Sequence, residues 1–392
     1  MSAPLKVMLV AVEPSADALG AGLARALKET LGEDAVAFVG VGGAKMAAEG
    51  VGSPIDIADL SLVGIFEIAG AVPLALRAIE TTTRLAESER PDVAVLIDSW
   101  EFTWRVARRL RLRAPGVAIV KYVAPQVWAS RPGRARDLAR LCDGLMTLFA
   151  FEPPHFEAAG VPTRYVGNPA LSRAASGEDA ARFRRSIGAA PHEPILLVAP
   201  GSRRSEIRRV MPSFEDAALR LKGERPDLHL VIPAAETVAA EVRTRVSGWP
   251  HRAHVTETEA DKFAAMRAAT AAIACSGTVT TQLAVAGCPM VVGYRAHPAT
   301  AVVARMVVRT RYLTLINIAA GEAVAPEFLQ ERCTGARLAE AAAILLDDPA
   351  RRSLQAAAQT EALGRLGGAV PDPYAAAAEA VLETARRRGW PG

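Results

Sequence analysis

Two acidic residues stand where strand-like apolar segments end in the first half of the chain. Asp98 follows one such segment and Glu13 follows another. Because loss of solvation strengthens a carboxylate as a base, Asp98 is a candidate to take a proton from a sugar hydroxyl. The alternative is that these side chains cap helices. This alternative applies to Asp98 and Glu13, and also to Ser15 and Asp17, which lie close to Glu13 in the sequence.

The clearest anion-binding pattern lies in the second half, after the apolar segment Leu196–Ala199. The chain breaks at a Pro-Gly pair, and hydroxyl and guanidinium groups follow at the start of a helix. Backbone N–H groups, the positive helix end and an arginine fork together suit a diphosphate. An ordinary capped helix start is the alternative. The candidate residues are Gly201, Ser202, Arg203 and Glu206.

A second turn of small hydroxyl residues follows the apolar segment Ala271–Cys275. Ser276, Gly277 and Thr278 place O–H and N–H groups around a glycine, and Gln282 follows on the same predicted helix. Either turn alone is a weak signal, but the pair predicts that this half of the chain holds a nucleotide diphosphate.

Missing patterns disfavour several classes of chemistry. There is no DxD triplet to hold a divalent cation, and the six histidines show no metal-ligand spacing. GxxxxGK[ST], GxGxxG after the first strand and GxSxG are also missing, which disfavours Walker-type ATPases, dinucleotide dehydrogenases and α/β-hydrolases. We therefore expect no metal and no other cofactor, with helix ends and Arg203 neutralising the leaving group.

The elements that must position these residues follow an α/β pattern, in which short apolar segments alternate with helical stretches. Strands are expected at Lys6–Val12, Val36–Val41, Asp92–Asp98, Val117–Val123, Leu145–Phe149 and Thr163–Val166, and then at Ile195–Pro200, Leu228–Pro233, Ala253–Thr256, Ala271–Cys275 and Pro289–Tyr294. We predict two doubly wound, Rossmann-like domains that face each other across a cleft, with ligands where strands end.

The length of 392 residues favours two domains. We expect a first domain over residues 1–170, a polar, alanine-rich linker over 171–193, and a second, nucleotide-binding domain over 194–365. Residues 366–392 form a helical tail that we expect to pack back on the first domain.

Composition indicates a cytoplasmic protein that is at most peripheral to a membrane. Four cysteines without CxxC spacing fit a reducing compartment, and the first apolar run is too short for a signal peptide. The apolar stretch Leu62–Leu76 contains Glu67 and Pro73 and falls short of the ~20 residues that span a bilayer.

Basic residues are clustered although the net charge is only +4. Arginines recur within Arg105–Arg113, Arg131–Arg140 and Arg305–Arg311. These clusters either form solvated helix faces or attract an anionic membrane surface. Nucleic acid is disfavoured, since no binding motif accompanies the charge and aromatic residues are only 5%.

In this order, the segments resemble the lipid-A-disaccharide synthase family of inverting GT-B glycosyltransferases. The first half matches at Glu13–Asp17, Phe38–Gly43, Val63–Glu67, Pro91–Asp98, Tyr122–Ala129 and Phe151-Glu152. The second half matches at Pro200–Arg203, Ser276–Thr278, Pro289–Arg295 and Asn317. The resemblance covers about residues 5–345.

The resemblance implies a UDP-2,3-diacylglucosamine donor, a 2,3-diacylglucosamine 1-phosphate acceptor, and a β-1,6-linked disaccharide product. Asp98 would be the base for the acceptor 6-hydroxyl, and Arg203 with the 276–278 turn would hold the nucleotide. Acyl chains would lie along Gly64–Leu76. The family also implies a homodimer and peripheral association with the inner membrane. Further site positions implied are Glu13, Ser15, Asp17, Gly64, Glu67, Gln126, Arg295 and Asn317.

The chain departs from the family motifs near the expected site, at Val12, Ala16, Trp100, Ala150, Asn168 and Gln282. Gln282 replaces an acid that holds the nucleotide ribose in such enzymes, and an amide is the weaker acceptor. The alternative is a paralogous glycosyltransferase with another lipid acceptor or UDP-sugar donor. A UDP-sugar epimerase and a non-catalytic nucleotide-binding scaffold are two further alternatives.

Overall fold

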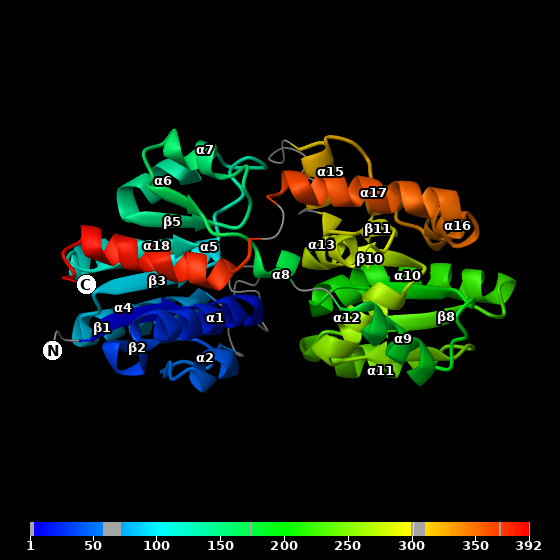
Figure 1. Cartoon of the computed structure of the whole chain (residues 1–392), viewed down its shortest axis with the longest axis horizontal. Helices are drawn as coiled ribbons and strands as arrows, with labels where there is room; N and C mark the ends of the chain where they lie inside the picture. Colours follow the sequence, from blue (N-terminus) through cyan, green and yellow to red (C-terminus); the bar gives the residue numbers. More distant parts are fainter. Residues whose placement is uncertain are drawn as a thin grey trace. The chain divides into compact units, whose positions relative to one another are not determined.

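The computed structural model describes residues 4–57, 72–172, 175–298, 301, 310–367 and 370–391 (Figure 1). The chain divides into two compact units, Met1–Pro169 with Ala369–Gly392 as unit 1 and Ala170–Gly368 as unit 2. Each unit is built on one six-stranded sheet, and every strand pair in the two sheets is parallel.

The sheet of unit 1 has the strand order β2-β1-β3-β4-β5-β6. Its strands are β1 (Leu5–Val10), β2 (Val36–Val41), β3 (Val93–Ile97), β4 (Ala118–Tyr122), β5 (Gly144–Thr147) and β6 (Thr163–Tyr165). The predicted ranges differ from these by at most two residues at either end. Because all strands are parallel, their carboxyl ends lie along one edge, and the residues that follow them gather there.

Helices cover both faces of this sheet, because successive strand residues point to opposite sides. Val7 and Leu9 of β1 belong to the core under α1 (Pro14–Leu31) and α18 (Pro373–Arg387). Met8 and Val10 belong to the opposite core, with α4 (Val72–Glu89), α5 (Trp100–Arg113), α6 (Arg134–Leu141) and α7 (Pro153–Glu157). Residues buried on both faces of a sheet are apolar, which is why the run Val7–Val10 of the first strand could be recognised from sequence.

The end of the chain lies in unit 1, as the red helix α18 in Figure 1 shows. This helix packs on α1, where Gly22 makes room for the ring of Tyr374; a Cβ on Gly22 would lie 2.2 Å from that ring. Arg164 of β6 also forms an ion pair of 2.6 Å with Glu379 on α18.

The sheet of unit 2 has the order β12-β11-β10-β7-β8-β9. Its strands are β7 (Ile195–Ala199), β8 (His229–Pro233), β9 (Ala253–Thr256), β10 (Ala271–Cys275), β11 (Met290–Tyr294) and β12 (Glu327–Leu329). Its helices include α10 (Arg204–Glu224), α11 (Ala239–Val246), α12 (Glu259–Ala268), α13 (Thr278–Val285), α15 (Leu315–Ala320), α16 (Gly335–Asp347) and α17 (Pro349–Arg365). The sequence pattern missed β12, which has only three residues.

The segment expected as a linker, residues 171–193, is largely a folded part of unit 2. It contains α9 (Gly177–Ser186), which packs on α12 and buries Phe183. The Ser176 hydroxyl caps this helix by accepting the Asp179 N–H, and Arg184 donates to the carbonyl of Ala268. Its polar composition reflects capping and exposure of one helix face.

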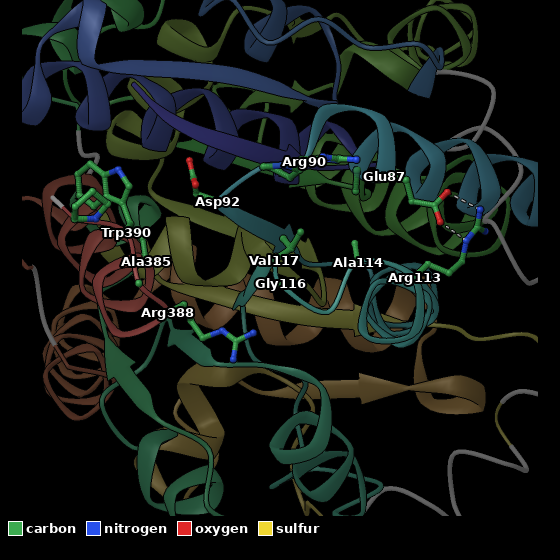
Figure 2. Close-up of a pocket in the computed structure, with 14 residues that line it drawn as sticks. Glu87, Arg90, Asp92, Arg113, Ala114, Gly116, Val117, Ala385, Arg388 and Trp390 are labelled. Carbon is green, nitrogen blue, oxygen red and sulfur yellow. Dashed lines mark hydrogen bonds and ion pairs between the residues drawn. The ribbon is translucent and has the colours of Figure 1, made fainter. Parts of the chain in front are cut away.

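A cavity of about 590 Å³ opens at the other edge of the unit 1 sheet, where the strands begin (Figure 2). Asp92 and Val117, which precede β3 and β4, line it together with Arg388 and Trp390 from the end of the chain. The cavity therefore lies at the opposite end of the strands from the candidate residues of unit 1, which follow the carboxyl ends of those strands.

Candidate active site

The two candidate carboxylates follow neighbouring strands of the first sheet. Glu13 comes after β1 and Asp98 comes directly after β3, and these strands pair with Val10 opposite Leu96. Both acids are half-buried. Glu13 occupies the N-cap position of α1, but its side chain accepts no hydrogen bond from that helix. Instead, the Ser99 hydroxyl donates to Glu13 Oε1 at 2.8 Å.

The turn that carries Asp98 has an unusual backbone. Asp98 and Ser99 have φ values of 49° and 36°, and Val123 at the end of the adjacent β4 has φ 71°. Left-handed conformations cost a residue with a Cβ about 1–2 kcal/mol each. Strain of this kind is found at functional sites, where the surrounding structure holds it in place.

Sequence reasoning missed a lysine beneath this turn. Lys121 of β4 is only 3% exposed, and its ammonium donates to the carbonyl of Asp98. Burial lowers the Lys121 pKa to about 8, although the charges of Asp98 and Glu13 oppose this effect. A lysine inside the apolar segment 117–123 was the available signal.

Asp17 lies near Glu13 in sequence but serves the fold. Its buried carboxylate accepts the N–H groups of Gly43 at 2.7 Å, Lys45 at 3.1 Å and Met46 at 3.1 Å. It thereby caps the short helix α2 (Ala44–Ala48). These contacts account for Asp17 without a substrate. Ser15 is exposed in the first turn of α1.

The turns after β4 and β5 carry an aromatic cluster around a buried acid. Phe149 and Phe151 stack with their ring centroids 5.9 Å apart, and Trp128 meets Phe151 edge-on at 5.2 Å. Glu152 accepts the Phe149 N–H at 3.2 Å and Trp128 Nε1–H at 3.4 Å. Burial raises the Glu152 pKa to about 7. Gln126, in the turn after β4, is exposed.

The departure from the family motif at Trp100 has its own partners. The Arg134 guanidinium lies 5.0 Å from the Trp100 ring centroid and forms an ion pair of 3.0 Å with Glu101. Arg134, one of the clustered arginines at 131–140, therefore already has partners in Trp100 and Glu101.

Other clustered arginines are also paired within unit 1. Arg113 makes a bidentate contact with Glu87 (Figure 2). Both N–O distances are 2.6 Å. Arg111 pairs with Asp143 at 2.6 Å. The clusters therefore offer a membrane less free charge than their composition suggests. Gly64, Glu67, Arg305 and Arg309 lie outside the described residues.

The turn of unit 2 expected to hold a diphosphate follows β7. Gly201 has φ 107°, a conformation that favours glycine, and a Cβ there would lie 2.4 Å from Glu206 Oε2 and would displace that carboxylate. Glu206 accepts the N–H groups of Ser202 at 3.0 Å and Arg203 at 3.2 Å. This corrects the expectation of free backbone donors, since a carboxylate already holds two of them. Arg203 itself is exposed at the helix start.

The second turn follows β10, the strand that pairs with β7. Gly277 has φ 152° and is exposed together with Thr278, the first residue of α13. Ser276 and Gln282 are half-buried. Burial raises the Tyr294 pKa on the neighbouring β11, with Glu206 adding to the rise and Arg203 opposing it. Charged side chains of the turn after β7 therefore influence Tyr294 on β11, the strand next to the one that leads into the second turn.

Two further candidates of unit 2 hold its own loops. Asn317 is fully buried; its amide donates to Ala325 O at 2.7 Å and Glu327 Oε1 at 2.8 Å, and it accepts the Ala325 N–H at 2.8 Å. Arg295 donates to the carbonyls of Gln330 at 3.2 Å and Cys333 at 2.7 Å. These bonds explain both residues without a substrate contact.

Across the ranges that the structure describes, no group of three His, Cys, Asp or Glu side chains could hold a metal ion. Within the same ranges no helix is long and apolar enough to cross a bilayer.

The family model described as lipid-A-disaccharide synthetase matches residues 7–371. The chain belongs to this family. A lipid-A-disaccharide synthase of Rhodospirillum centenum is 42% identical over 385 residues, covering 98% of this chain and 96% of the relative. One of Rhodopseudomonas palustris (strain BisB18) is 43% identical over 380 residues, covering 96% and 95%. Because the chain belongs to this family, it is a glycosyltransferase of lipid A biosynthesis.

Solved structures of low sequence identity share the fold. The S. aureus MnaA-UDP co-structure gives a TM-score of 0.62 at 17% identity, covering 96% of this chain and 94% of that chain. The glycotransferase of kitacinnamycin gives 0.60 at 17% identity, covering 97% and 99%. The expected α/β GT-B fold, with two doubly wound domains, is confirmed.

Proposed function

We propose that the enzyme transfers 2,3-diacylglucosamine from its UDP donor to the 6-hydroxyl of 2,3-diacylglucosamine 1-phosphate. The hydroxyl oxygen bonds to the donor anomeric carbon while the bond from that carbon to the β-phosphate oxygen breaks. The hydroxyl proton passes to a carboxylate, and UDP leaves with the bonding electron pair. Attack opposite to the leaving group inverts the anomeric centre and gives the β-1,6-linked disaccharide.

The turns of unit 1 support this assignment of the base. Asp98 is presented by a strained turn at the edge of the sheet, half-buried and therefore partly desolvated. In the proposed mechanism Asp98 takes the proton. Glu13, held by the Ser99 hydroxyl, accepts a hydrogen bond from a sugar hydroxyl and orients it.

The turns of unit 2 support binding of the nucleotide. Arg203 is exposed at the start of α10, and the 276–278 turn begins α13 on the adjacent strand edge. The Arg203 guanidinium and the start of α13 favour the charge that develops on departing UDP. In this proposal Gln282, which is half-buried one helical turn into α13, donates a hydrogen bond to the ribose or accepts one from it.

Apolar side chains at the start of α4 support the proposed lipid contact. Val72, Leu74 and Leu76 are 38%, 38% and 44% exposed, although side chains of this kind are usually buried. In this proposal acyl chains lie against them while the enzyme binds the cytoplasmic face of the inner membrane. A homodimer is part of the same proposal.

The test is a thin-layer assay with purified enzyme, UDP-2,3-diacylglucosamine and 2,3-diacylglucosamine 1-phosphate. We expect a new lipid product, the disaccharide phosphate, which is separate from the acceptor on the plate, and one UDP for each disaccharide. Absence of the disaccharide would favour a paralogous activity with another acceptor or donor, to which the Trp100–Arg134 stack would then contribute. Donor turnover that needs no acceptor would favour a UDP-sugar epimerase.

A further inference from the structure

We propose that Lys121 is a positioning residue for the transfer reaction, because its buried ammonium holds the strained Asp98 turn and places a positive charge beside the two site carboxylates. This inference rests on the proposed function, in which Asp98 is the base. It adds to that function a residue on which the base depends.

The contacts of Lys121 join the ends of β3 and β4 to the Asp98 turn. Its ammonium donates to the carbonyls of Leu96 at 3.3 Å and Tyr122 at 3.3 Å, and to the carbonyl of Asp98. An ammonium has three N–H donors, so each has a carbonyl acceptor. The site is therefore built for the charged form of this lysine.

The Asp98 peptide is fixed from both sides by these bonds. The Thr103 hydroxyl also donates to the Asp98 carbonyl at 2.9 Å, and the Asp98 N–H donates to Tyr122 O at 2.9 Å. Because φ at Asp98 is 49°, the turn needs such restraint to stay in a left-handed conformation. Loss of the ammonium would leave the Thr103 hydroxyl as the remaining described donor to the Asp98 carbonyl and would weaken the restraint on the peptide that carries the base.

A lysine is a costly choice at this position if it serves only the fold. The other residues of β4, such as Ile119 and Val120, are buried, and an apolar side chain would fit the same strand without desolvating a charge. The charged and titratable groups that act on Lys121 are Asp98, Glu13 and the Cys142 thiol. Burial raises the Cys142 pKa to about 12, so this thiol is neutral near pH 7.

The charge of Lys121 gives the inference a signature in pH. With a Lys121 pKa of about 8, the ammonium loses its proton as pH rises through that value. It then keeps two N–H donors and no charge. We expect kcat to fall through this range while UDP affinity, which depends on unit 2, stays constant.

The experiment compares Lys121→Met with Lys6→Met in the disaccharide assay from pH 6 to 9.5. Lys6 is the matched control, because it lies on β1 of the same sheet and its ammonium donates to the Glu89 carbonyl at 3.0 Å, away from the site. We expect Lys121→Met to lower kcat at pH 7 at least tenfold, to leave UDP affinity within twofold, and to abolish the falling limb near pH 8. Lys6→Met should behave as the wild type.

Three outcomes would overturn the inference. The first is a folded Lys121→Met enzyme, verified by thermal unfolding and UDP binding, with kcat within twofold of wild type. The second applies if Lys121→Met does not fold: a wild-type kcat that shows no falling limb between pH 7 and 9.5. The third is a wild-type enzyme that makes no disaccharide, which overturns the proposed function as well and is distinguished by the wild-type assay alone.

Discussion

Ser99 Oγ and Glu13 Oε1 lie 2.8 Å apart in a hydrogen bond that joins the turns after β1 and β3. Ser99 has φ 36°, a conformation that glycine would adopt with less strain. Glycine has no hydroxyl, however, and could not hold Glu13. The hydrogen bond to Glu13 therefore gives a reason for a serine at this position despite the strained backbone.

Replacing Ser99 with glycine or with alanine separates these two effects. Both Ser99→Gly and Ser99→Ala remove the hydroxyl, so we expect each to lower kcat about tenfold, equivalent to ~1.4 kcal/mol. Only Ser99→Gly relieves the left-handed strain, and its free energy of unfolding should exceed that of Ser99→Ala by about 1 kcal/mol. Urea denaturation and the disaccharide assay measure the two quantities. Full activity in either variant would show that the hydroxyl does not position Glu13.

Asp98→Asn keeps the shape of the side chain and removes its basicity. We expect kcat to fall by about 10²–10⁴, the usual contribution of a general base. UDP affinity, measured by calorimetry, should not change, because the nucleotide is assigned to unit 2. Asp92→Asn is the control, since Asp92 precedes β3 at the opposite edge and accepts the Lys6 N–H at 2.8 Å. Retained transfer in Asp98→Asn would remove Asp98 from its role as base.

Most of the fold could be predicted because its strands are buried on both faces. A segment such as Leu196–Ala199 is apolar throughout and contains no charged residue, so the pattern predicts a buried strand. The exceptions have physical causes. Strand β12 is held by pairing with β11 and by Asn317, which bonds Glu327, and neither contact is local in sequence. Helix α9 looked like a linker because its exposed face and cap are polar.

The site was harder to predict, because helix caps and ligand sites use the same residue types. Asp17, Glu206 and Asn317 each matched a motif, yet each side chain bonds the backbone of its own unit. Sequence does not show which N–H groups are already bound. Lys121 illustrates the opposite case, a residue outside every motif that the strand order brings beneath Asp98.

Arg203→Ala should weaken UDP binding in unit 2. A hydrogen bond to a charged group contributes about 1.5–3 kcal/mol, so we expect the Kd for UDP to rise roughly 10- to 100-fold. Arg208→Ala is the matched control, because Arg208 is exposed on the same helix, α10, one turn further on. Equal effects of the two substitutions would indicate general attraction between UDP and a basic helix in place of a specific contact.

Glu152→Gln should change stability in a pH-dependent way. Burial raises the pKa of Glu152 to about 7, above its ordinary 4.5, so the folded protein binds this proton more tightly than the unfolded chain does. The stabilisation is fully present below about pH 4.5 and is lost as pH rises through 7. Glutamine resembles the protonated acid at every pH, and its oxygen can still accept the Phe149 N–H.

We therefore expect Glu152→Gln to match the wild type near pH 5 and to exceed it above pH 7. The gain should reach on the order of 3 kcal/mol in the free energy of unfolding, from about 1.4 kcal/mol for each pKa unit. Urea titrations at pH 5, 7 and 8.5 measure it. Glu157→Gln, at an exposed position of α7, should show no such dependence. A constant difference between Glu152→Gln and wild type across this range would mean that Glu152 keeps its charge in the folded protein.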